Sequence, residues 1–139
     1  MATPKPAGYS GTPLVQKLGF KEESRVALLG APAGFEELLE PLPRGVKIQR
    51  RAEAKSDIVH LFVARREELA EELIRLRALL QPDAVLWISW PKKAAKVPTT
   101  ISEETIRELA LPLGWVDIKV CAVDEVWSGL KLVVRKSQR

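Results

Sequence analysis

The 139 residues of this chain are enough for one hydrophobic core, and contents of 46% hydrophobic and 29% charged residues exclude a disordered or fibrous protein. Lys and Arg number 22 against 18 Asp and Glu, and a net charge of +4 is too small to indicate nucleic acid as the partner. The one cysteine, Cys121, cannot form an internal disulfide, and no apolar run has the length of a signal peptide or a membrane span, so we expect a cytoplasmic protein.

Pro and Gly divide the first half of the chain into short segments. Residues 1–11 are rich in both and are predicted to form an extended arm, whereas residues 12–139 are predicted to form one domain. This domain is expected to begin with a short helix over Leu14 to Leu18, which Gly19 follows, and then a strand over 25–30. A helix over about 33–40, ended by Pro41, and a strand over 46–50 come next. The last of these is polar, which is typical of a strand near a sheet edge.

The second half alternates apolar runs with helical periodicity. Strands over 57–64 and 84–90 are apolar on both faces and are therefore predicted to be central and parallel. A helix is expected over 65–80, a second is expected to open with a capping box from Thr100 to Glu103, and strands over 115–123 and 129–135 read as an antiparallel hairpin. The sequence thus predicts an α/β fold: a three-layer Rossmann-like sheet, mostly parallel, with a C-terminal antiparallel hairpin.

Two loops are candidates for binding a ligand. Gly30, Ala31 and Gly34 belong to a small-residue turn between a strand and a helix, where open α/β sheets present backbone N–H groups to phosphates. Lys92, Lys93 and Lys96 follow another strand, and ligand crevices open at the carboxyl ends of such strands. The alternative is that these lysines only solvate a surface loop.

Residues 25–136 resemble a shortened Rossmann-like methyltransferase. The resemblance rests on the helix end, proline and strand of residues 80–88 and on the closing hairpin. It implies S-adenosylmethionine as the cofactor and methyl transfer as the activity.

A narrower resemblance covers nearly the whole chain. The segments 8–14, 90–93, 96–99 and 123–130 are similar to a small bacterial family described only as domain of unknown function 3052. This family implies no activity.

The chain departs from the methyltransferase pattern at three positions. Ala31 and Pro32 occupy the middle of the turn, where glycines let the backbone approach the cofactor, and Pro32 lacks an N–H. The second strand, which in that family ends in a carboxylate for the ribose hydroxyls, ends in Arg50 and Arg51. The third ends in Ala64, Arg65 and Arg66 instead of acceptors for a target amine. We therefore predict that no cofactor is bound and no residue is catalytic.

The remaining chemistry-bearing residues have structural alternatives. Trp87 and Trp90 must face opposite sides of their strand, and Trp90 could line a crevice mouth. Trp127 could stack on a ligand or only hold the hairpin loop together. Asp124 and the adjacent Glu125 are candidates for acid–base work or for holding Mg²⁺, but a role in a turn or at a rim is favoured because neighbours in sequence often point apart. The only histidine, His60, and Cys121 are interpreted as core residues, and no metal site is predicted.

Three functions remain open on the sequence. The first is a non-catalytic binding or regulatory module for a small anionic, phosphate-bearing ligand or a protein partner. The second is a divergent S-adenosylmethionine-dependent methyltransferase, or another transferase or hydrolase that uses Lys92, Lys93, Asp124 or Glu125. The third is a homodimer module in which an edge strand and residues 1–11 pair with another chain. Neither nucleic acid nor a membrane is expected as a partner.

Overall fold

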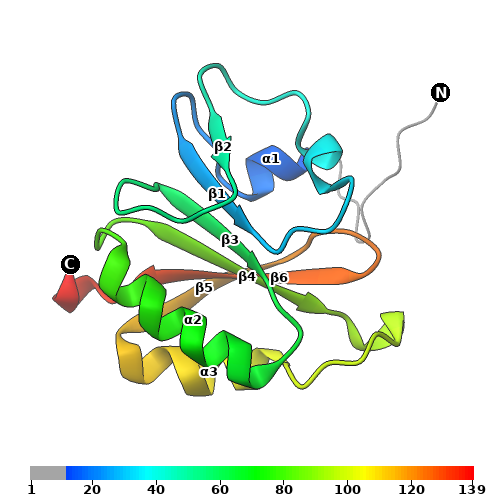
Figure 1. Cartoon of the computed structure of the whole chain (residues 1–139), viewed down its shortest axis with the longest axis vertical. Coiled ribbons are helices and arrows are strands. Elements are labelled where there is room, and N and C mark those ends of the chain that lie inside the picture. Colours follow the sequence, from blue (N-terminus) through cyan, green and yellow to red (C-terminus); the bar gives the residue numbers. More distant parts are fainter. Residues whose placement is uncertain (1–11) are drawn as a thin grey trace.

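The computed structural model describes residues 12–139, and the arm expected over residues 1–11 lies outside the described residues. Six strands form one sheet in the order β2-β1-β3-β4-β6-β5 (Figure 1). β1 to β4 are parallel, whereas β6 pairs antiparallel with both β4 and β5. The predicted mostly parallel sheet with a C-terminal antiparallel hairpin is therefore confirmed. The strands are β1 (Arg25–Leu29), β2 (Lys47–Gln49), β3 (Ile58–Phe62), β4 (Val85–Pro91), β5 (Trp115–Ala122) and β6 (Trp127–Val134).

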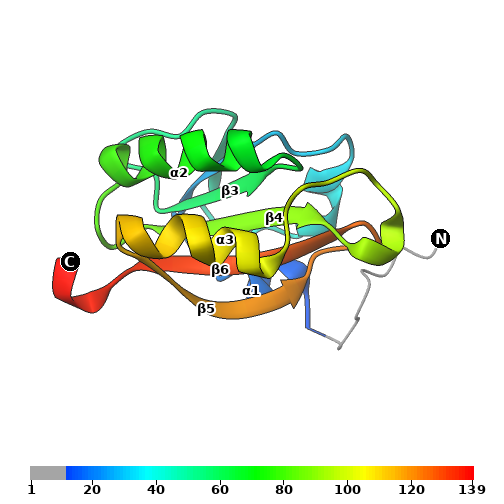
Figure 2. The same cartoon turned by 90° about the horizontal axis from the view of Figure 1, so that it is seen from below.

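Helices cover both faces of this sheet. The two longer helices, α2 and α3, lie together on one face, and α1 with the 3₁₀ segment η1 lies on the other (Figure 2). Within residues 12–139, no helix combines the length and the apolar character needed to cross a lipid bilayer. The helical segments are α1 (Leu14–Lys17), η1 (Phe35–Leu39), α2 (Arg66–Leu79), η2 (Lys93–Ala95), α3 (Glu103–Ala110), η3 (Leu111–Leu113) and η4 (Lys136–Gln138).

Side-chain alternation along the central strands builds two cores, one on each face. On β3, Val59 and Leu61 face α2 and α3, whereas Ile58 and Phe62 face α1 and η1. All five residues of β3 are buried, as expected for a parallel strand covered on both sides. Trp87, in the α1 core, and Trp90, in the α2 core, confirm that the two tryptophans of β4 face opposite sides.

The helix expected over about 33–40 is wrong in type and length. The chain forms only the five-residue 3₁₀ segment η1, with Gly34 in the left-handed conformation at its start and no side chain capping it. Six residues separate Gly34 from Pro41, which cannot continue a helix. Short pieces of this kind adopt the tighter 3₁₀ geometry.

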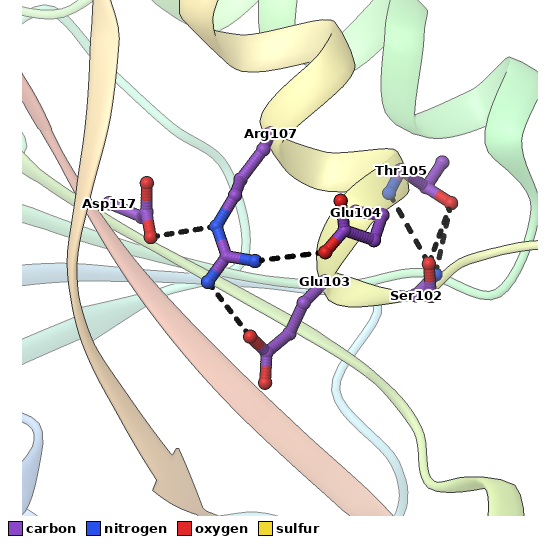
Figure 3. Close-up of polar contacts among 6 residues, drawn as sticks. All are labelled: Ser102, Glu103, Glu104, Thr105, Arg107 and Asp117. Atoms are coloured by element: carbon purple, nitrogen blue, oxygen red, sulfur yellow. Dashed lines mark hydrogen bonds and ion pairs between the residues drawn. The ribbon is translucent and has the colours of Figure 1, made fainter.

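The capping box of α3 is displaced by two residues from the one expected. Thr105 donates its N–H to Ser102 Oγ at 3.3 Å, and Ser102 donates its N–H to Thr105 Oγ1 at 3.1 Å (Figure 3). Thr100 is unavailable as the cap because its Oγ1 accepts the Arg66 N–H at the start of α2, at 2.7 Å. Two helices are thus started by neighbouring hydroxyls of one loop.

Arg107 connects α3 to the edge strand β5. Its guanidinium donates to Asp117 on β5 at 3.0 Å and to Glu103 one turn earlier in α3 at 2.8 Å (Figure 3). These hydrogen bonds, first to Asp117 and then to Glu103, raise the pKa of Arg107 above its ordinary value. The contact holds the helix against the strand by a charged fork rather than by apolar packing alone.

We expect Arg107→Ala to lower the urea midpoint of unfolding by more than Arg75→Ala does. Among residues 12–139, Arg75 on α2 pairs only with Glu72 in its own helix, at 2.7 Å, and such single exposed pairs contribute little. Arg107 instead joins two elements, so its loss removes a link between α3 and β5 that Arg75 does not provide. Urea titrations of both variants followed by circular dichroism test this, and equal midpoints would show that the link between the elements is not stabilising.

Candidate functional site

The candidate site lies at the edge of the sheet where the parallel strands end. β1, β3 and β4 are neighbours in the sheet, so the segments that follow them are also neighbours. These segments are the turn of residues 30–34, the start of α2 at Arg65 and Arg66, and the loop of residues 92–101. The loop between β5 and β6 reaches the same edge, because β5 runs parallel to β4.

The turn after β1 lies against the end of β3. Gly30 and Gly34 have left-handed φ angles of 71° and 83°. A Cβ on Gly30 would stand 2.9 Å from the backbone oxygen of Phe62, so the turn can approach β3 only because residue 30 is glycine. Within residues 12–139, the N–H groups of Ala31 and Gly34 donate to no protein acceptor.

The loop after β4 is fastened to the other side of the end of β3. Thr99 donates its hydroxyl to the Ala64 oxygen at 2.7 Å, and Thr100 donates its N–H to the same oxygen at 2.9 Å. The loop also contacts the β5–β6 hairpin, because Lys92 donates its N–H to the Val126 oxygen at 2.7 Å. The predicted turn and the predicted lysine loop therefore flank the same strand end.

Cations follow the ends of β2, β3 and β4. We call Arg51, Arg65, Lys92, Lys93 and Lys96 the basic rim; none of them forms an ion pair within residues 12–139. The charges of the adjacent Arg50 and Arg66 are balanced by ion pairs. Arg50 pairs with Glu36 of η1, and Arg66 pairs with Glu108 of α3 at 3.2 Å. From β2 to β4 the rim spans three strand spacings, roughly 14 Å.

Aromatic side chains fill the α1 side of the sheet beneath this edge. The ring centroid of Phe62 lies 4.7 Å from that of Phe35 and 5.2 Å from that of Trp127, and both pairs are edge to face. Phe35 and Phe62 are buried and Trp127 is half-buried. The cluster connects η1 to the start of β6 across the end of β3.

The other predicted site residues have structural tasks in the chain. Asp124 Oδ1 accepts the N–H groups of Val126 and Trp127, both at 2.8 Å, which is the turn-forming role that the sequence offered as the alternative. Glu125 is exposed beside it. Trp90 is 7% exposed and packs under α2 and α3, so its side chain offers little surface to a ligand.

His60 and Cys121 are core residues, as predicted. The His60 ring is fully buried, stacks on Phe62 at 4.2 Å and shares a 2.6 Å hydrogen bond between Nε2 and Ser89 Oγ. Burial lowers the pKa of His60 to about 3. Cys121 is 8% exposed, and burial raises the pKa of its thiol. Neither is poised to act as a base or nucleophile at neutral pH.

A hollow of about 370 Å³ lies away from these residues, between α1 and the end of β5. No candidate residue from the sequence analysis lines it. Its lining comes from two segments about a hundred residues apart and carries no motif, so sequence reasoning had no signal by which to find it. The lining residues are Thr12, Gln16, Lys17, Lys119, Val120, Cys121 and Ala122.

Comparison with known proteins shows the fold. No family model matches the chain, so the resemblance to domain of unknown function 3052 stays a prediction, and no curated protein matches it either. Among solved structures, an S-adenosylmethionine-dependent methyltransferase from Aquifex aeolicus is similar with a TM-score of 0.61, 17% identity and 87% of each chain covered.

Two further solved structures of similar fold match this chain. The DhpI complex with S-adenosylhomocysteine matches with a TM-score of 0.59, 12% identity, and 89% of this chain and 84% of that chain covered. A ribosomal protein methylase from Lactobacillus delbrueckii subsp. bulgaricus matches with a TM-score of 0.57, 13% identity, and 88% of this chain and 75% of that chain covered. The chain has a methyltransferase-like Rossmann fold.

Proposed function

We propose that this protein is a non-catalytic binding module that takes a phosphate-bearing ligand on the basic rim of its methyltransferase-like fold. One observation carries the proposal: cations without ion pairs follow the ends of three parallel strands at the edge where such sheets bind their ligands. Hydrogen bonds from Arg and Lys to phosphate are charge-assisted and strong.

The lysine loop is the most favourable part of the rim. The bonds of Thr99 and Thr100 to the Ala64 oxygen hold the carboxyl end of this loop beside the start of α2, where Arg65 lies. The turn of residues 30–34 adds free N–H groups, but η1 is too short to add a substantial helix dipole. The cations, rather than a helix N-terminus, therefore supply the attraction for an anion.

The same edge lacks the groups that the methyltransferase resemblance requires. No carboxylate ends β2, where Arg50 is paired with Glu36 and Arg51 is exposed. At the end of β3, the Ala64 oxygen already accepts two hydrogen bonds from the loop after β4. A binding role without methyl transfer agrees with both features.

Titration with inorganic pyrophosphate in a calorimeter tests the rim. We expect the double variant Lys92→Ala/Lys93→Ala to bind at least about tenfold more weakly than the parent, because two charge-assisted contacts are lost. The control Lys21→Ala/Lys136→Ala removes the same charge from exposed lysines at the opposite edge of the sheet and should bind as the parent does. Equal weakening in both variants would leave only a general effect of net charge, and no binding by the parent would contradict the proposal.

The methyltransferase alternative is favoured by one specific observation, the fold shared with the solved methyltransferases. It predicts that S-adenosylhomocysteine binds to this chain and that S-adenosylmethionine supports methyl transfer. The binding-module proposal predicts neither. The same calorimetric titration, repeated with S-adenosylhomocysteine, separates the two functions, and tight binding accompanied by turnover would replace our proposal.

A further inference from the structure

The basic rim is spread along the sheet rather than gathered at one point. Arg51 follows β2, Arg65 follows β3, and Lys92, Lys93 and Lys96 follow β4. Because β1 lies between β2 and β3, the strand before Arg51 is two spacings from β3 and three from β4, roughly 9 Å and 14 Å. A compact phosphate would contact only one part of such a row.

The three segments that carry these cations lead to the same face of the sheet. Ala52, the residue after Arg51, packs against the core beneath α2 and α3. Leu69 of α2 and Ile101, which follows the lysine loop, belong to the same core, and both helices lie on that face (Figure 2). The turn after β1 leads instead to Phe35 in the core on the α1 face. The cationic segments therefore share one side of this edge.

The charges of this row are available to a ligand. Lys92 is half-buried and the other members of the rim are exposed, and none of them has an ion pair in the part of the chain that the structure describes. Two acids that could neutralise the row are occupied, because Glu36 pairs with Arg50 and Glu108 pairs with Arg66. An anion that extends along the edge would meet cations after each of three strands.

We propose that the ligand of the basic rim is a linear polyphosphate chain that runs from the lysine loop past Arg65 to Arg51. This inference rests on the proposed binding of phosphate at the rim and adds the shape of the ligand. A chain of phosphoryl groups carries negative charge along its whole length, so it matches cations that are distributed over roughly 14 Å.

A nucleic-acid backbone also presents a row of phosphates, but the described residues at this edge offer its bases little surface. Proteins that bind single strands stack the bases on aromatic side chains. Here Phe35 and Phe62 are buried, and the half-buried Trp127 already packs edge to face against Phe62. An inorganic polyphosphate requires cations alone, which is what the row provides.

Calorimetric titrations with pyrophosphate and with a linear polyphosphate long enough to span the row test the inference. Arg51 is the member farthest from the lysine loop, so Arg51→Ala should leave pyrophosphate binding unchanged and weaken binding of the long chain about fivefold or more. Arg51→Lys keeps the charge and should retain the parent's affinity for both. The control Lys47→Ala removes a positive charge from the other end of the same strand, where Lys47 is exposed, and should change neither affinity.

The outcomes separate this inference from the proposed function. If the parent binds neither phosphate, both are wrong. If the parent binds pyrophosphate but Arg51→Ala affects the long chain no more than Lys47→Ala does, the ligand is compact and only the row is overturned. If a single-stranded oligonucleotide binds more tightly than a polyphosphate with the same number of phosphates, the ligand is a nucleic acid and the polyphosphate is excluded.

Discussion

Acidification from pH 6.5 to 5.0 should reduce the free energy of unfolding by about 2 kcal/mol through His60 alone. Burial lowers the pKa of this imidazole from 6.5 to about 3, and its ring has only the Ser89 hydroxyl as a polar partner among the described residues. Below pH 6.5 the unfolded chain binds a proton that the folded chain does not bind. Stability therefore falls as the pH decreases toward the folded-state pKa, and the full loss is about 5 kcal/mol.

The surroundings of His60 explain why the folded state resists the proton. Phe35 and Phe62 lie against its ring, and in the part of the chain that the structure describes no carboxylate accepts a hydrogen bond from it. An imidazolium there would be a buried charge without a counter-ion, which costs far more than the neutral ring. The neutral form is retained because the rings and the Ser89 hydroxyl fit it.

Urea unfolding at several pH values tests this, with His60→Gln as the matched variant that cannot titrate in this range. Well below pH 6.5, the difference in unfolding free energy between parent and variant should change by about 1.4 kcal/mol per pH unit, which is the slope for one bound proton. Because His60 is the only histidine, its ring signals in a proton NMR spectrum provide a second readout and should stay constant from pH 8 to 4. A ring that titrates near pH 6.5 would contradict the burial argument.

Much of the sheet could be predicted because its signals are local. The apolar segment around Val59 is bounded by turn residues and buried on both faces, and the observed strand differs from the expected one by two residues or fewer at either end. Parallel pairing followed from the helix between β3 and β4. The end of α1 at Gly19 could likewise be predicted, since glycine tolerates the left-handed conformation that follows a helix better than other residues do.

The errors arose where a distant partner decides a local choice. Thr100 and Ser102 are both good helix caps, and the choice between them depends on Arg66, 34 residues earlier, whose N–H takes the Thr100 hydroxyl. The sequence placed the lysine loop at the correct edge by the rule for strand ends. It could not show that Phe62 and Trp127 would fill the space beneath, because their contact joins residues from two different strands.

Gly30→Ala should destabilise the protein by about 2–4 kcal/mol, roughly twice the effect of Gly34→Ala. Both glycines have left-handed φ angles, and a Cβ in that conformation costs about 1–2 kcal/mol at either position. Only at Gly30 does the Cβ also meet another segment, the Phe62 backbone oxygen at 2.9 Å, whereas nothing lies within 4 Å of it at Gly34. The displaced atom would be a strand carbonyl rather than a flexible side chain, so relief requires moving the turn away from β3.

Urea titrations of the two variants separate the cost of the backbone conformation from the cost of the contact. The Gly34→Ala variant reports the conformational cost alone, and the excess in Gly30→Ala reports the close approach of the turn to β3. Moving the turn away from β3 would also move the free N–H groups of Ala31 and Gly34, so pyrophosphate should bind more weakly to Gly30→Ala than to Gly34→Ala. Equal losses of stability in the two variants would mean that the turn can move away from β3 at no cost in free energy. The turn would then be held too loosely to orient a phosphate.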